Sequence, residues 1–139
     1  MASHKLRWLC NGASAWAIAF GAPHLWWALG VRYGFPGGDA SYDRFMGSAW
    51  RFVYDCIVVV CSVLAVAIAR TLMKPPAGVV RRWIPMSLAW FACAILLVRG
   101  VGGHIIDGTS DLVWAPMFTL GGLLMGGVAW TARVPQTPE

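Results

Sequence analysis

Seven ionisable residues lie toward one end of four apolar segments of this sequence: His24, Arg51, Asp55, Arg99, His104, Asp107 and Asp111. An ionised side chain at the centre of a membrane span costs about 3 kcal/mol or more. Ionisable residues at matching depth in several apolar segments therefore predict a polar pocket between helices, open toward one face of a bilayer. Histidine and carboxylate side chains within reach of one another transfer protons, so acid–base chemistry is the chemistry predicted for this pocket.

Asp55 is the candidate acid. It lies about 10 Å from the outer end of the second apolar segment. Arg51 precedes it by one helical turn, a spacing at which two side chains can pair. The two residues are either a structural ion pair that stabilises helix packing or an acid tuned by burial and by Arg51. His24 lies at a matching depth in the first segment, where it is either a proton-transfer partner of Asp55 or a histidine hydrogen-bonded to an ordinary neighbour.

The remaining ionisable residues lie nearer the surface. Arg99 is at the outer end of the third segment, where it either contributes to the site or extends its guanidinium toward headgroups. His104, Asp107 and Asp111 follow it and are predicted to form the rim of the pocket. The predicted catalytic set is thus Asp55, His24, Arg51 and Arg99.

Two pairs of acids stand four residues apart, Asp39 with Asp43 and Asp107 with Asp111. On a helix such a pair can share Mg²⁺, and through it a diphosphate. Neither segment has a helical pattern, and Gly108 lies inside the second. The prediction is therefore a site without metal or other cofactor, with Mg²⁺ as the alternative.

Tryptophan is abundant, with nine in 139 residues. Trp8, Trp83 and Trp130 suit the cytoplasmic membrane interface, where tryptophan rings commonly lie. A second group flanks the polar residues and is predicted to line a substrate cavity: Trp26, Trp27, Trp50, Tyr54 and Trp114. An aromatic wall suits a large apolar substrate or a developing cation, and anchoring at the interface is the alternative.

Four helices must position these side chains. The chain is 58% hydrophobic and only 12% charged, whereas a soluble domain carries about 25% charged residues. Apolar segments near residues 8–30, 48–72, 83–102 and 112–132 are each long enough to cross a bilayer. Short connections favour antiparallel neighbours. We therefore expect an all-α polytopic membrane protein, an up-down bundle of four transmembrane helices in a single domain over 1–134, with a disordered tail at 135–139.

Basic residues indicate the orientation of the bundle. Most of them flank the ends of the apolar segments opposite the polar cluster, as Lys5, Arg7, Arg70, Lys74, Arg81, Arg82 and Arg133. Basic loops remain in the cytoplasm, so both termini are predicted to be cytoplasmic in a plasma (inner) membrane protein. The net charge of +5 then reports topology and predicts no nucleic-acid partner.

Glycines are frequent in the predicted outer loops and in the fourth apolar segment. Gly34, Pro36 and Gly37 predict an irregular first outer loop, and the glycines of 100–108 predict the same for the second. Gly122-x-x-x-Gly126, with Gly121 and Gly127, allows close approach of helices. This motif predicts packing within the bundle, with a homo-oligomer as a further option.

Three short motifs resemble those of a known family. His24-Leu25-Trp26-Trp27-Ala28-Leu29-Gly30 resembles the H-x-x-W-A-L-G signature of a family of small bacterial integral membrane proteins of unknown function. Arg99-x-x-Gly102 resembles its second signature, and Asp111 with Trp114-Ala115-Pro116 its third. After Arg99 the sequence His104-Ile105-Ile106-Asp107 replaces a more aromatic stretch. The resemblance implies four spans and singles out His24, Arg99 and Asp111, but it implies no reaction.

The leading functional prediction is a membrane enzyme that cyclises or isomerises a lipid-soluble substrate, such as an isoprenoid, by acid initiation at Asp55. Neither D-x-D-D nor D-D-x-x-D occurs, so any likeness to soluble terpene cyclases concerns mechanism alone. The alternatives are a small proton-coupled transporter or channel, a haem carrier with His24 and His104 as ligands, and a non-catalytic membrane assembly protein.

Overall fold

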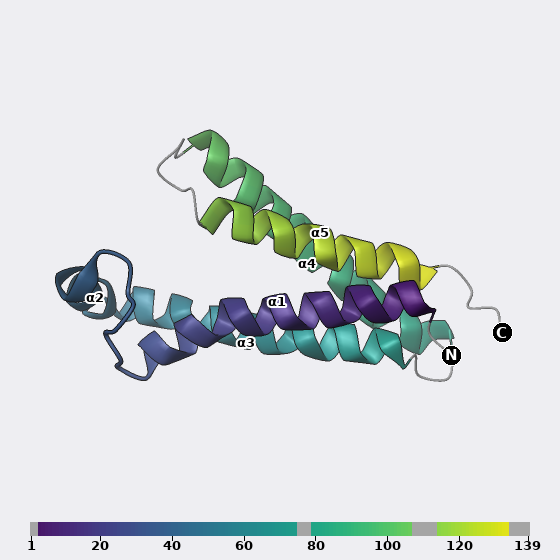
Figure 1. Ribbon diagram of the computed structural model, residues 1–139, viewed down its shortest axis with the longest axis horizontal. Coiled ribbons are helices and arrows are strands. Elements are labelled where there is room, and N and C mark those ends of the chain that lie inside the picture. The colour runs from purple at the N-terminus through teal and green to yellow at the C-terminus, as the bar shows by residue number, and fades with distance from the viewer. Residues whose placement is uncertain (1–2, 75–78, 107–113, 134–139) are drawn as a thin grey trace. The chain divides into compact units, whose positions relative to one another are not determined.

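The computed structural model describes residues 3–74, 79–106 and 114–133, without the side chains of residues 79–81, 104 and 106. These residues form five helices and no strand, which confirms the all-α class. In chain order the helices are α1 (His4–Ala28), α2 (Gly38–Met46), α3 (Ala49–Met73), α4 (Val79–Ile106) and α5 (Trp114–Arg133) (Figure 1). The predicted tail at 135–139 lies outside the described residues.

Three segments are long and apolar enough to cross a membrane: Ala49–Met73, Arg82–Gly103 and Trp114–Arg133. They correspond to the second, third and fourth predicted spans. α1 is also 25 residues long, which is about 37 Å of helix. It does not reach the same hydropathy, because polar residues such as Lys5, Arg7 and Asn11 interrupt its apolar positions.

The helices differ from the expected pattern at two places. The first outer loop, predicted to be irregular, contains the nine-residue helix α2. α4 continues through Gly100, Gly102 and Gly103 to Ile106, although these glycines predicted its end. Tertiary packing accounts for this continuation, because a side chain at Gly100 would collide with Thr119 and with the carbonyl oxygen of Ala115. The contact with α5 thus offsets the weak helix propensity of glycine.

The chain divides into two compact units. The first, called here the α4–α5 unit, comprises Met1–Ala17 and Ala65–Glu139. The second, called here the α2 unit, comprises Ile18–Leu64 and therefore holds α2, the end of α1 and most of α3.

Within the α4–α5 unit, α4 and α5 lie side by side (Figure 1). A side chain at Gly122 would meet Leu97, and one at Gly126 would meet the sulfur of Cys93. On another face of α5, Gly121 lies against the ring of Trp16, whose indole N–H donates a hydrogen bond of 3.0 Å to the carbonyl oxygen of Met117. The glycines of α5 therefore serve helix packing, as predicted.

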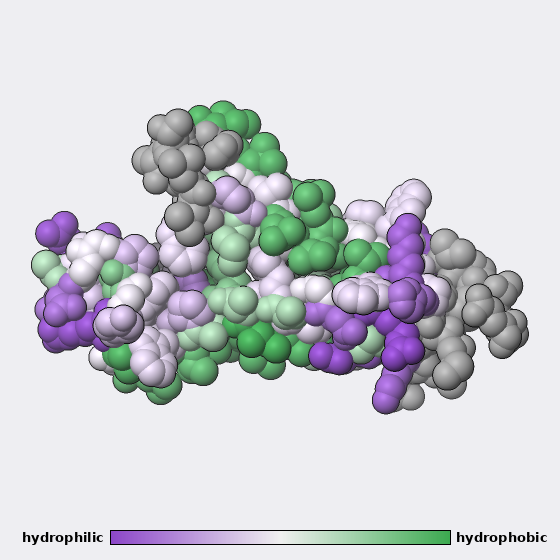
Figure 2. Space-filling view, viewed as in Figure 1, coloured by the Kyte–Doolittle hydropathy of each residue, from purple (hydrophilic) through white to green (hydrophobic). Residues whose placement is uncertain are grey.

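Figure 2 shows where hydrophobic and hydrophilic residues gather on the surface. The exposed residues of α4 include the large apolar side chains of Phe91, Ile95 and Val98, each more than half exposed. Hydrophilic residues gather over α2, which includes Asp39, Asp43 and Arg44. An exposed apolar helix surface of this kind suits contact with lipid. The four cysteines form no disulfide; Cys10 and Cys93 are buried, whereas Cys61 is exposed.

Candidate functional site

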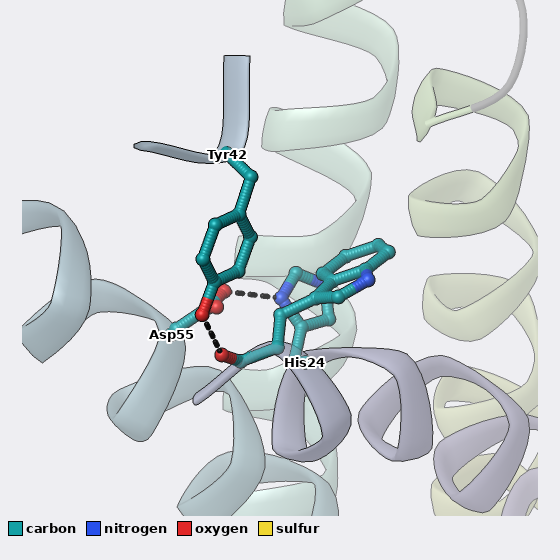
Figure 3. A network of polar contacts seen from close by, with 4 residues as sticks. His24, Tyr42 and Asp55 are labelled. Atoms are coloured by element: carbon teal, nitrogen blue, oxygen red, sulfur yellow. Dashed lines mark hydrogen bonds and ion pairs between the residues drawn. The ribbon is translucent and has the colours of Figure 1, made fainter. Parts of the chain in front are cut away.

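The centre of the α2 unit is a contact between His24 of α1 and Asp55 of α3. Nδ1 of His24 lies 2.6 Å from Oδ1 of Asp55 (Figure 3). Asp55 is 1% exposed and His24 is 7% exposed. A carboxyl group and an imidazole at this distance are hydrogen-bonded, and the surrounding low dielectric strengthens their interaction. The structure thus brings together the two residues that the sequence predicted as a proton-transfer pair.

A close approach of two helices places these side chains. A Cβ atom at Gly21 would lie 2.6 Å from Cβ of Ser62, nearer than two carbon atoms can stand. Gly21 precedes His24 by about one helical turn, and Ser62 follows Asp55 by about two. The absence of a side chain at Gly21 therefore lets α1 and α3 approach closely enough for the His24–Asp55 contact.

Aromatic rings of α1 enclose the imidazole. The ring of Phe20 lies 5.1 Å from that of His24, and the ring of Trp27 lies 5.4 Å away in an edge-on arrangement. Phe20 and Trp27 are four residues before and three residues after His24, on the same helix face. Both are buried, so His24 is shielded from solvent along its own helix.

α2 and the loop before it extend this enclosure. The ring of Phe35 lies 5.0 Å from that of Trp27 and 5.4 Å from the rings of Tyr42 and Phe45. The hydroxyl of Tyr42 donates a buried hydrogen bond of 2.9 Å to the carbonyl oxygen of Trp27 (Figure 3). These contacts join α2 to the turn of α1 that carries His24.

Arg51 does not pair with Asp55 among the described residues. It is exposed, and its guanidinium lies 5.5 Å from the centre of the Phe45 ring. The spacing of Arg51 and Asp55 allowed a local pair, but His24 on the neighbouring helix takes the carboxylate instead. A second ion pair of this unit, Arg32 with Asp43, is exposed to solvent.

Only one of the five predicted wall residues is buried at this site. Trp27 is buried beside His24, whereas Trp26, Trp50 and Tyr54 are exposed. Trp114 is half-buried at the start of α5 and belongs to the other compact unit. Helical periodicity explains this result, since Trp26 and Trp27 are adjacent and must point to different faces.

The other predicted residues belong to the α4–α5 unit. Arg99 lies in the α4–α5 unit, where its guanidinium is 5.2 Å from the centre of the Phe118 ring. His104 lies on α4, inside the helix rather than beyond it, but its side chain is not among those described. Asp107 and Asp111 lie outside the described residues.

The acids considered for Mg²⁺ are partly described. Asp39 and Asp43 share α2 and are both exposed, and Asp43 is 3.0 Å from Arg32. Within the described part of the chain, no three histidine, cysteine or acidic side chains lie close enough together to hold a metal ion. The carboxylate of Asp43 is therefore paired with Arg32, and that of Asp39 is exposed to solvent.

Oδ2 of Asp55 is fully buried and has no hydrogen-bond partner among the described residues. A buried carboxylate oxygen that accepts no hydrogen bond costs about 1–3 kcal/mol. Such an atom in a folded protein calls for a functional or structural reason. A polar ligand group that hydrogen-bonds to Oδ2 would remove this cost.

Sequence reasoning missed Phe20, Phe35, Tyr42 and Phe45. The position of Phe20, one turn before His24, was a usable signal. The other three lie in the segment predicted to be an irregular loop, where no periodicity indicated which side chains turn inward.

Comparison of this chain with models of known protein families, with curated proteins and with solved structures finds no match.

Proposed function

We propose that this protein is an integral membrane enzyme in which Asp55, assisted by His24, acts as a general acid on an apolar, lipid-dissolved substrate. An isoprenoid alkene or epoxide is the substrate class that fits an acid in an aromatic environment. The observation that carries the proposal is the contact of 2.6 Å between His24 Nδ1 and the almost fully buried Asp55.

The two oxygens of Asp55 have different roles in this proposal. Oδ2 holds the proton, and Oδ1 accepts the hydrogen bond from His24 Nδ1–H. When the proton moves to the substrate, the O–H bond breaks and the alkene π electrons form a new C–H bond. The resulting carboxylate is stabilised by His24, and the carbocation by nearby rings such as Trp27. Loss of a different proton from the cation to Asp55 completes an isomerisation or cyclisation without any co-reactant.

A substrate must reach a carboxyl group that is covered in this conformation. The cover is α2, joined to α1 by the Tyr42–Trp27 hydrogen bond and by the ring of Phe35. Gly34 and Gly37 before α2 and Gly38 at its first position have positive φ angles, and Gly47 ends the helix. In the proposal, movement of α2 about these glycines admits the substrate.

Deuterium transfer to substrate carbon tests the proposal. The purified protein is reconstituted in nanodiscs with the alkenes geranylgeraniol and squalene in deuterated buffer, and the lipids are analysed by mass spectrometry. Acid-initiated turnover leaves a C–D bond that does not exchange. Asp55→Asn retains an oxygen that accepts the hydrogen bond from His24 but holds no transferable proton, so incorporation should stop while the protein remains folded.

Asp43→Asn is the matched control, because it changes an exposed carboxylate of the same unit. Deuterium incorporation that survives in Asp55→Asn would refute the assignment of the acid. Loss of incorporation in both variants, restored by added Mg²⁺, would instead favour the metal interpretation of Asp39 and Asp43.

A second candidate, a proton-coupled transporter, is favoured by the depth of burial of the pair. His24 and Asp55 are enclosed by protein and could exchange a proton without any organic substrate. Proton flux into vesicles that contain the protein, lost in Asp55→Asn, would support transport. Vesicles that show no proton flux, together with formation of a lipid product, would support the enzyme.

The finer membrane architecture belongs to the same proposal. We propose that α1 crosses the bilayer with the three apolar helices, giving four spans and cytoplasmic termini in the plasma (inner) membrane. The length of α1 and the basic residues Lys5, Arg7 and Arg133 support this arrangement. Membership of the family of small four-span bacterial proteins is likewise a proposal, supported by the signature around His24.

A further inference from the structure

Two arginines meet where α4 begins and α5 ends. Nη2 of Arg82 donates a hydrogen bond to the carbonyl oxygen of Ala132, the residue before Arg133. Arg82 is the first residue of one apolar segment, and Arg133 is the last residue of another. The two arginines therefore lie at the same end of the α4–α5 unit, at the level where its apolar segments stop.

The guanidinium of Arg133 lies against two tryptophan rings. Its Cζ atom is 4.9 Å from the centre of the Trp90 ring, on α4, and 5.8 Å from that of the Trp130 ring, one turn earlier on α5. A guanidinium has five N–H donors, and those of Arg133 take part in no hydrogen bond or ion pair with the described residues. The rings thus hold the cation in place without offering its donors an oxygen.

No carboxylate balances these charges within the described part of the α4–α5 unit. The described acids, Asp39, Asp43 and Asp55, all belong to the α2 unit. Arg82 uses one donor on a backbone carbonyl, which neutralises no charge. The planar edge of a guanidinium matches two oxygens of a phosphate. An external phosphate is therefore the group whose charge and shape complement this end of the unit.

The surroundings of the two arginines favour a lipid phosphate over one dissolved in water. Trp83, next to Arg82, is 62% exposed, and Trp130 is 63% exposed. Exposed tryptophan rings at the end of an apolar segment are typical of the membrane interface, where phospholipid headgroups lie. A headgroup at this level reaches the arginines while its acyl chains extend along the apolar helices.

We propose that Arg82 and Arg133, flanked by Trp83 and Trp130, form a site for the phosphate of one anionic phospholipid. The site requires only that this end of the α4–α5 unit lies at a membrane surface. It does not depend on the chemistry of the buried acid–base pair, which belongs to the other unit. The lipid is a lasting partner of the protein and not a reactant.

Native mass spectrometry tests the site. The protein is released from nanodiscs that hold phosphatidylglycerol and phosphatidylcholine in equal amounts, and the lipid that remains bound is weighed. The wild type should retain phosphatidylglycerol preferentially. Arg133→Gln should weaken that retention about tenfold, the usual effect of losing a hydrogen bond to a charged group. Arg133→Lys keeps the charge without the planar donors and should weaken it less.

Two controls keep the test decisive. Arg44→Gln removes an exposed arginine of α2 and should leave retention unchanged. Excess inorganic phosphate should not displace the lipid from the wild type, and displacement would assign the site to a water-soluble anion instead. Equal retention of the two lipids by the wild type, or unchanged retention in Arg133→Gln, would also overturn the proposal. None of these outcomes bears on deuterium transfer by Asp55.

Discussion

The hydroxyl of Tyr42 donates a hydrogen bond to the backbone of Trp27, three residues after His24, and so helps to hold α2 against the turn of α1 that carries the buried histidine. The hydrogen bond is 2.9 Å long and is buried. In the proposed mechanism α2 covers Asp55, so we expect the stability of this contact to affect access to the carboxyl group. Five predictions follow from the arrangement of these residues, one of which concerns this contact directly.

Tyr42→Phe should make Asp55 more accessible. The change removes one buried hydrogen bond, worth about 1 kcal/mol, and leaves the ring contact with Phe35 in place. The rate of labelling of Asp55 by a hydrophobic carbodiimide, measured by peptide mass spectrometry, should rise about fivefold for that energy. Tyr33→Phe alters an exposed tyrosine of the same unit and should leave the rate unchanged. An unchanged rate in Tyr42→Phe would show that α2 does not limit access.

His24→Ala and Asp55→Ala should each destabilise the protein by about 3 kcal/mol or more, because each leaves a buried polar partner unsatisfied. The double variant should lose less than the sum, with a coupling of about 1 kcal/mol or more. The measurement is unfolding of the reconstituted protein by a denaturing detergent.

Arg32 and Asp43 provide the matched cycle for this coupling. Their side chains are 53% and 55% exposed, so their coupling should be below about 1 kcal/mol. Equal coupling in the two cycles would mean that burial adds nothing to the His24–Asp55 contact.

Gly21→Ala should separate α1 from α3 at the site. The added Cβ atom would lie 2.6 Å from Cβ of Ser62, so one helix must shift. We expect a loss of about 1–3 kcal/mol, the usual cost of overpacking a core. Ser62→Gly in the same chain should restore most of the stability. Gly102→Ala, in open space, is the control and should not destabilise. A Gly21→Ala variant as stable as the wild type would contradict the close approach.

The number of spans should be visible in the positions of the two chain ends. If α1 crosses with α3, α4 and α5, residues 3 and 133 lie on the same side of the membrane; with only the three apolar spans they lie on opposite sides. We expect the same, cytoplasmic side. Cysteines introduced at Ser3 and Arg133 in a chain without its own cysteines, labelled by a reagent that does not cross membranes, give the answer. Labelling of one position only from outside would exclude four spans.

Asp55→Asn should retain the fold and lose deuterium transfer, whereas Asp55→Leu should do the same at lower stability. Asparagine keeps an acceptor for His24, but leucine leaves the imidazole without its partner. Comparing melting temperature with turnover in the two variants separates the role of the carboxyl group in stability from its role as a proton donor. Loss of stability without any loss of turnover in both variants would make the pair purely structural.

The sequence by itself determined the four long helices. Apolar runs of about 20 residues give a signal that tertiary contacts rarely override. The predicted spans therefore agree with α1, α3, α4 and α5 to within a few residues at most ends. The short helix α2 was not predicted, because the glycines and acids of its segment are typical of a loop.

The tertiary structure decided which side chains meet. Spacing along one helix suggested Arg51 as the partner of Asp55, since local neighbours are all that periodicity can reveal. The close approach at Gly21 and Ser62 brought His24 to the carboxylate instead and left Arg51 against Phe45. Contacts between helices depend on where two backbones can approach, and that is set by packing across the chain rather than by the order of residues within one segment.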